Sequence, residues 1–223
     1  MDWQALALSL KLALWTSGIL LLIGIPLAYW LAVSGSRFKF LIEALVTLPL
    51  VLPPTVLGFY VLFALGPLST LGRWTAQAFG QAIPFSFAGL VIGSVLCSLP
   101  FAVQPFMTAF AAVDREMIES SWCMGVSPVR TFFRLILPLS RGGVIAGVIL
   151  SFAHTVGEFG VVLMLGGNIP GVTRTLSIAI YDDVQSLNYG GAGTASAVLL
   201  GLSFFILILM FSTKKASRTL GVS

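Results

Sequence analysis

The stretch DREMIESSWCMGVSPVRTFFRLILP, residues 114–138, separates two long apolar runs and predicts two short helices joined by a sharp turn. The first helix should run from about Asp114 to Met124, with carboxylates toward its N-terminal side, where they suit the helix dipole. Gly125 suits a left-handed C-terminal cap. Ser127 then reads as an N-cap with Pro128 at the first helical position. Pro138 is expected to interrupt the second helix before the next apolar run.

This charged stretch also carries a row of large apolar side chains, which need something to be buried against. The row consists of Ile118, Trp122, Phe132, Phe133, Leu135 and Ile136. One interpretation is that it packs beneath the membrane helices of its own chain. The other is that it forms a docking element for the groove of a soluble partner. The pattern alone leaves both open.

The flanking sequence is that of an all-α integral membrane protein. Hydrophobic residues make up 57% of the 223 residues and charged residues 9%, whereas soluble domains carry about 25% charged residues. A spanning helix needs roughly 20 apolar residues, and the first run is expected to be retained, because Met1-Asp2-Trp3 lacks the positive start of a signal peptide. The five expected spans are Leu12–Val33, Ala44–Leu65, Phe85–Phe110, Gly143–Leu165 and Ala195–Phe211. They form a single domain, 1–223, with one long loop at 111–142.

The lysines and arginines give the sidedness. Nine of the twelve lie in the connection 34–43, in the loop 111–142 or in the C-terminal tail, and the other three are Lys11, Arg73 and Arg174. The positive-inside rule places the nine in the cytoplasm. The N-terminus is therefore expected outside and the C-terminus inside a bacterial or archaeal plasma (inner) membrane. The basic residues do not cluster as a nucleic-acid footprint would, so no nucleic-acid partner is expected.

Within the loop, Glu119-Ser120-Ser121, then Gly125, then Ile136-Leu137-Pro138 resemble the EAA loop of ABC importer permeases. That pattern is Glu-Ala-Ala, three residues, Gly, about nine residues, then Ile, any residue and Leu-Pro. This sequence differs by having serine at both alanine positions and isoleucine directly before Leu-Pro. The resemblance implies that roughly Glu116 to Val126 is a coupling helix that sits in a cleft of an ATPase subunit. The residues it assigns to this contact are Glu119, Ser120, Ser121, Trp122, Met124, Gly125, Leu137 and Pro138.

Three more segments are similar to the molybdate permeases of the molybdate/tungstate/sulfate group: Leu48–Pro54, Gly157–Gly160, and Asn168–Gly171 with the following Thr173-Arg174-Thr175. The resemblance implies a MetI-like core, alternating access, two ABC ATPase subunits and an extracytoplasmic oxyanion-binding protein. It implies no catalysis and no cofactor on this chain, with ATP used by the partner. An odd number of spans favours a second copy of the chain, with the route on the dimer axis. Tungstate or sulfate import stays open, as do a stand-alone secondary anion transporter and a scaffold without transport.

Several residues are candidates for the anion route. Pro53 and Pro54 break hydrogen bonds in the second span, which is expected to be either a deformable stretch lining a cavity or a static kink. On the outer side, Thr173 and Arg174 could form a gate or guide the anion, or Arg174 could be an ordinary solvated loop residue.

Three other features are expected to be structural. His154 and Glu158 stand at i, i+4 in the fourth span and are expected to pair, since intramembrane charges are costly. Direct contact with the substrate and proton coupling are the alternatives. Cys97 and Cys123 show neither a disulfide pattern nor metal-ligand spacing. The glycine-rich run Tyr189–Thr194 lacks the Lys-Ser/Thr of a P-loop and is expected to be a flexible entry to the fifth span.

Overall fold

A computed structural model of the protein describes residues 2–219, and no strand is found within that range. The helices are α1 (Trp3–Val33), α2 (Lys39–Val51), α3 (Pro54–Leu65), α4 (Thr70–Phe79), α5 (Phe87–Ala111), α6 (Arg115–Cys123), α7 (Pro128–Thr131), a π-helical segment η1 (Phe132–Ile136), α8 (Leu137–Leu139), α9 (Arg141–Gly157), α10 (Gly160–Gly166), α11 (Leu176–Gln185) and α12 (Tyr189–Thr219). The predicted all-α membrane class is confirmed.

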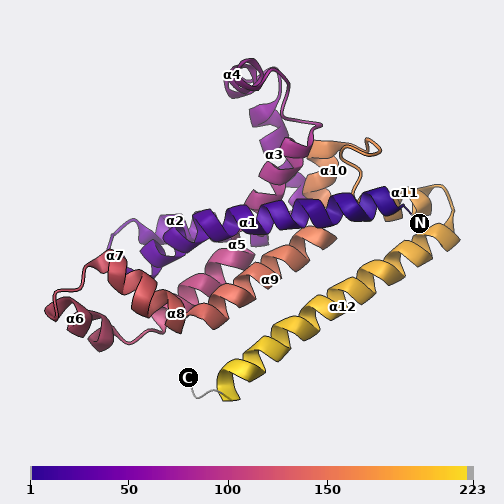
Figure 1. Ribbon diagram of the computed structural model, residues 1–223. Helices are drawn as coiled ribbons and strands as arrows, with labels where there is room; N and C mark the ends of the chain where they lie inside the picture. Colours follow the sequence, from indigo (N-terminus) through magenta and orange to yellow (C-terminus); the bar gives the residue numbers. More distant parts are fainter. Residues whose placement is uncertain (1, 220–223) are drawn as a thin grey trace.

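The centre of the molecule is a bundle of α1, α5 and α9, which Figure 1 shows running alongside one another. On α1 the buried residues recur every three or four positions, from Leu20 through Gly24 to Ala28 and Leu31, as one face of a helix requires. Small residues let the helices approach closely. A Cβ atom added at Gly147 of α9 would lie 2.5 Å from a ring carbon of Phe106.

The second expected span is broken into two helices. Leu52 and Pro53 are both extended, with ψ of 136° and 133°, because each precedes a proline and the α conformation is disfavoured there. The axes of α2 and α3 consequently differ by 115°. The kink predicted at Pro53 and Pro54 is thus confirmed, and it is sharp enough to divide the expected span Ala44–Leu65 into two helices.

The fourth expected span, Gly143–Leu165, is also broken. It divides into α9 and α10 at Glu158, whose backbone is extended (φ −64°, ψ 134°). Figure 1 shows α10 beside α3, with both helices directed away from the bundle axis. Gly160 makes this contact possible, because a Cβ atom there would lie 2.8 Å from that of Pro54.

The number of spans agrees with the prediction once the bent pairs are counted. Within residues 2–219, α1, α5 and α12 are each long and apolar enough to cross a membrane. Two bent pairs raise the count to five: α2 with α3, and the helical run Pro128–Leu139 with α9. The glycine-rich run Tyr189–Thr194 is not a flexible entry, because it forms the first turns of α12. The side chain of Asn188 accepts a hydrogen bond from Gly191 N at 3.2 Å and so caps this end.

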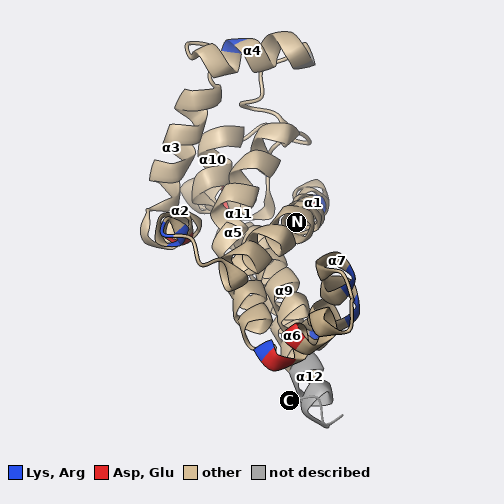
Figure 2. Ribbon diagram, turned by 90° about the vertical axis from the view of Figure 1, so that its left-hand side faces the viewer, with Lys and Arg blue, Asp and Glu red and all other residues tan. Residues whose placement is uncertain are grey.

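The expected cytoplasmic segments gather at one end of the molecule. In Figure 1 the α1–α2 connection, α6 and α7 lie at the left, and α12 runs back toward that side, whereas the N-terminus lies at the right. Figure 2 shows Lys and Arg at the start of α2 and along α7. The side chains of Lys214, Lys215 and Arg218, which also supported the predicted sidedness, lie outside those that the structure describes.

Candidate functional site

The segment from Asp114 to Leu139, called the hairpin below, contains α6, α7, η1 and α8. Asp114 caps α6 by accepting a hydrogen bond from Glu116 N at 2.9 Å. Gly125 has φ +79°, and Val126 N bonds to Ser121 O at 3.1 Å, which closes the helix end with a left-handed residue. Ser127 caps α7, with Pro128 at its first turn. The predicted helix–turn–helix is confirmed.

Pro138 does not interrupt the second helix as expected. The chain stays helical from Pro128 to Leu139 and first departs from helical geometry at Ser140, where the axis turns by 73°. The reason is η1, in which Leu137 N bonds to Phe132 O, five residues back. This wider turn brings Pro138 to the start of a new helical turn, where no backbone N–H is required.

The apolar row of the hairpin is divided between two faces. Ile136 is 1% exposed and belongs to the core cluster of α1 and α5, and Ile118 packs against the same cluster. The Phe132 ring lies 4.8 Å from that of Tyr29 and 5.8 Å from that of Phe110. In contrast, Phe133 is 62% exposed. Packing beneath the chain's own helices is therefore confirmed for the inner face, whereas docking of the exposed outer face on a soluble partner stays a prediction.

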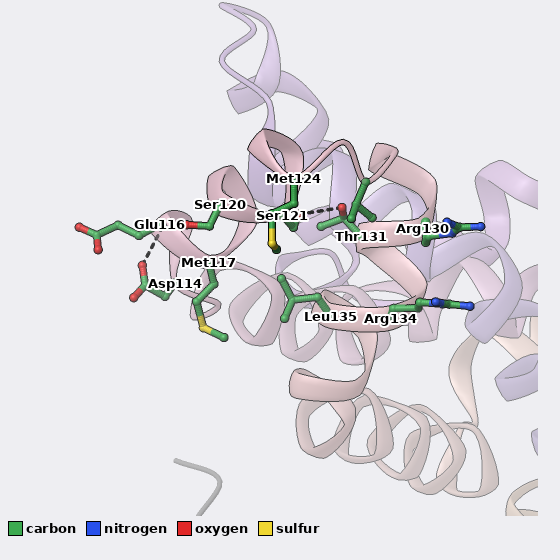
Figure 3. A pocket seen from close by; sticks show the side chains of 11 residues that line it. Asp114, Glu116, Met117, Ser120, Ser121, Met124, Arg130, Thr131, Arg134 and Leu135 are labelled. Atoms are coloured by element: carbon green, nitrogen blue, oxygen red, sulfur yellow. Dashed lines mark hydrogen bonds between the residues drawn. The ribbon is translucent and has the colours of Figure 1, made fainter.

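Between α6 and the second helix lies a groove of about 600 Å³. Figure 3 shows Asp114 and Glu116 at one end and Arg130 and Arg134 at the other. Its floor is held by the Ser121 hydroxyl, which lies 2.9 Å from that of Thr131 and donates to Ile118 O at 2.7 Å. The groove thus has an acidic end, a basic end and a fixed polar floor, with the exposed Met124 (76%) on its rim.

The remaining residues that the sequence assigned to the hairpin contact occupy both surfaces. Glu119 is half-exposed and pairs with Arg115 at 2.8 Å, and Trp122 is 46% exposed. Ser120 is exposed and lines the groove. Leu137 packs on the core cluster, whereas Pro138 is exposed. The structure alone does not test their role, which stays a prediction.

A second polar cluster lies where α9 ends. His154 Nε2 is 3.7 Å from Glu158 Oε2, so the expected i, i+4 pair is present. The other oxygen, Oε1, accepts from Val161 N at 3.1 Å and caps α10. Cys97 of α5 donates to Glu158 Oε2 at 3.2 Å. This cysteine could not be predicted as a neighbour, because 61 residues separate it from Glu158.

The helix break also opens a cavity of about 570 Å³. Its lining comes from α3, α9 and α10: Pro54, Thr55, Ala153, His154, Gly157, Glu158, Phe159 and Gly160. Of the two prolines predicted for the route, Pro54 therefore lines this cavity, whereas Pro53 forms the bend itself.

The outer loop places Thr173 and Arg174 in contacts of their own. Thr173 is fully buried, and its hydroxyl donates to Gly166 O at 2.6 Å. Arg174 lies 3.2 Å from Asp182 and 3.7 Å from Asp2, so it links α11 to the start of α1. Its charge is shared with two carboxylates. A role in anion guidance stays a prediction.

Apolar helices long enough to cross a membrane, a structured hairpin at one end and two broken helices define a multi-pass membrane protein. The chain belongs to the family of binding-protein-dependent transport system inner membrane components, which residues 24–219 match. It is accordingly an integral protein of the inner membrane.

Named relatives and solved structures agree with this assignment. The chain is 47% identical to the Molybdenum transport system permease protein ModB of Azotobacter vinelandii over 96% of this chain and 95% of that protein. It is 33% identical to the ModB of Escherichia coli (strain K12), over 95% and 92% of the two chains. Its fold matches an inward-facing structure of the MetNI methionine ABC transporter with a TM-score of 0.72, at 18% identity, covering 100% of this chain and 96% of the other.

Proposed function

We propose that this chain is the permease subunit of an ATP-driven molybdate importer and acts as a homodimer with two ATPase subunits and an extracytoplasmic binding protein. The single observation that carries the proposal is the likeness, over nearly the whole chain, to permeases named for molybdenum transport. The fold shared with a methionine ABC transporter supports the ATP-driven class. ATP binding and hydrolysis are assigned to the partner subunit.

The hairpin is the proposed site of coupling to the ATPase. Its outer face offers aromatic and thioether side chains, such as Phe133 and Met124, of the kind that anchor protein interfaces. The groove has Glu116 at one end and Arg130 at the other. It would suit a partner surface that is basic opposite Glu116 and acidic opposite Arg130. This contact corresponds to the docking role that the sequence predicted for the segment from Glu119 to Gly125.

The inner face of the hairpin would carry the motion onward. Ile136, Phe132 and Ile118 are packed into the cluster formed by α1 and α5. A displacement of the hairpin when the ATPase dimer closes must therefore shift these helices or break the packing. Packed interfaces tend to switch between discrete arrangements rather than deform continuously. Alternating access would follow from such a switch.

The anion route is proposed to pass the cavity at the two helix breaks. Molybdate is a tetrahedral dianion, which hydroxyls, backbone N–H groups and sparing positive charge recognise best. Pro54 and Thr55 bring a helix start and a hydroxyl to this cavity. Arg174 is largely neutralised by its carboxylate partners, so selection is assigned mainly to the binding protein.

The test is reconstitution of the dimer with its ATPase and binding protein in liposomes, with ATP-dependent uptake of molybdate as the readout. Glu119→Arg or Gly125→Glu should abolish uptake and ATPase stimulation while membrane insertion is unchanged. The matched control is Phe38→Ala, at an apolar residue on the same side, 68% exposed but outside the hairpin. Normal transport by both hairpin variants contradicts the coupling role.

Two other results of the same experiment would change the assignment. Sulfate or tungstate taken up in preference to molybdate would move the substrate within the oxyanion group. Proton-dependent flux through the chain alone, without an ATPase, would replace the importer by a secondary transporter. His154 and Glu158 are the residues that would carry such a coupling.

A further inference from the structure

Three donor atoms of different chemistry meet at the break between α9 and α10. The thiol of Cys97, the imidazole of His154 and the carboxylate of Glu158 each offer one atom, and these atoms lie within 4.8 Å of one another. Cys97 and Glu158 are buried, and His154 is partly buried. Sulfur, imidazole nitrogen and carboxylate oxygen are the ligands that zinc uses in proteins.

The distances suit a shared cation. Zinc bonds of about 2.0–2.3 Å arranged as a tetrahedron require ligand atoms about 3.4–3.6 Å apart. The sulfur of Cys97 is 3.2 Å from Glu158 Oε2, and His154 Nε2 is 3.7 Å from the same oxygen. The second distance exceeds the range of an ordinary N–H···O hydrogen bond. Two of the three separations are therefore close to those of ligands on one ion, and the third is within 4.8 Å.

The hydrogen bonds around His154 determine which ring nitrogen is available. Thr155 donates its single hydroxyl proton to Ser151 O at 2.8 Å, so it accepts the bond from Ser98, whose oxygen is 2.9 Å away. The Ser98 proton is thereby used, and its oxygen must accept from Nδ1 of His154 at 2.9 Å. In the neutral ring, Nε2 then carries a lone pair that faces a carboxylate.

Other contacts hold the ligands in this orientation. The His154 ring stacks on Phe101, with centroids 4.0 Å apart, and Val161 N holds the second oxygen of Glu158 at 3.1 Å. Such supporting bonds to the ligands are typical of metal sites. The neighbouring cavity, lined by Pro54 and Thr55, leaves room for a fourth ligand and a path of entry.

We propose that Cys97, His154 and Glu158 form a binding site for a zinc-class divalent cation at the helix break. The ion would join α5 to the junction of α9 and α10 and would balance a thiolate and a carboxylate beside the cavity. This proposal departs from the expectation that neither cysteine binds metal, since spacing along the chain could not reveal a ligand from another helix.

The probe is Cd²⁺, which gives an ultraviolet charge-transfer band only when a thiolate binds it. The full chain is purified in lipid nanodiscs as Cys123→Ser, so that Cys97 is the only thiol. We expect one Cd²⁺ per chain, displaced by Zn²⁺. In the same background, Cys97→Ser should abolish the band, and His154→Ala should weaken binding by at least about 10-fold.

Ser98→Ala removes the hydrogen bond that orients the His154 ring. Loss of a supporting residue of this kind lowers metal affinity by about 10- to 100-fold, which is the effect expected here. Its matched control is Ser94→Ala, one turn earlier on α5, whose buried hydroxyl has no hydrogen-bond partner in the described structure. Thermal unfolding checks that each variant is folded. Absence of the band in the Cys123→Ser chain at saturating Cd²⁺, or unchanged affinity in folded His154→Ala, would overturn the proposal.

Discussion

Adjacent phenylalanines on the hairpin should affect two different properties when each is replaced by alanine. Phe132 packs between Tyr29 and Phe110, whereas Phe133 is 62% exposed. Truncation of a buried phenylalanine costs about 3–5 kcal/mol, and each aromatic contact adds about 0.5–1.5 kcal/mol beyond its buried area. Because Phe132 is only partly buried, we expect Phe132→Ala to lower the free energy of unfolding by about 2–4 kcal/mol, a fall of roughly 4–16 °C in Tm.

Phe133→Ala should instead leave Tm unchanged and weaken binding of the ATPase subunit. A central aromatic anchor contributes about 2 kcal/mol to an interface, which is about 30-fold in Kd. The assays are thermal unfolding of the permease in nanodiscs and titration with purified ATPase. Phe38→Ala, of similar exposure at 68%, should change neither. If Phe133→Ala binds the ATPase normally, or if Phe132→Ala is as stable as the parent, the two faces of the hairpin have been misassigned.

Three further substitutions test the packing. Gly147→Leu should destabilise the chain by about 1–3 kcal/mol, because the new side chain clashes with Phe106. The control in the unfolding assay is Gly201→Leu, where a Cβ atom meets no neighbour. Equal stability of the two variants would contradict the packing. Ser121→Ala should lower the free energy of unfolding by about 1 kcal/mol, because it leaves the Thr131 hydroxyl without its partner. Unchanged stability in the same assay would mean that the two hydroxyls do not form this bond. Asp182→Asn should lower the free energy of unfolding by less than about 1 kcal/mol, and by less at high salt, because Arg174 is partly exposed. A salt-independent loss would refute the ion pair.

The local chemistry of the hairpin could be predicted from the sequence because its signals are short-range. Asp114, Gly125, Ser127 and Pro128 each specify a cap or a turn within a few residues. Pro138 shows the limit of such short-range signals. A proline normally ends a helix, but a single π turn shifted the hydrogen-bond register and absorbed it.

The site in the membrane interior could be predicted only in part. The i, i+4 spacing of His154 and Glu158 gave their pairing correctly. The prolines indicated the break in the second span. Hydropathy, however, measures apolar length and not direction, so the break at Glu158 could not be read from the sequence. Cys97 approaches Glu158 through the packing of α5 on the α9–α10 junction. The four-residue spacing of Ser94 and Ser98 was the one available sign of a polar stripe on that helix.

The docking of the hairpin can be measured directly through a native thiol. Cys123 lies exposed at the end of α6, and Cys97→Ser leaves it as the only cysteine. A short thiol-to-amine crosslinker applied to the reconstituted complex should join Cys123 to the ATPase subunit, with a yield that falls in Phe133→Ala. Crosslinks that form only within the permease, with the ATPase present and active, would contradict the account.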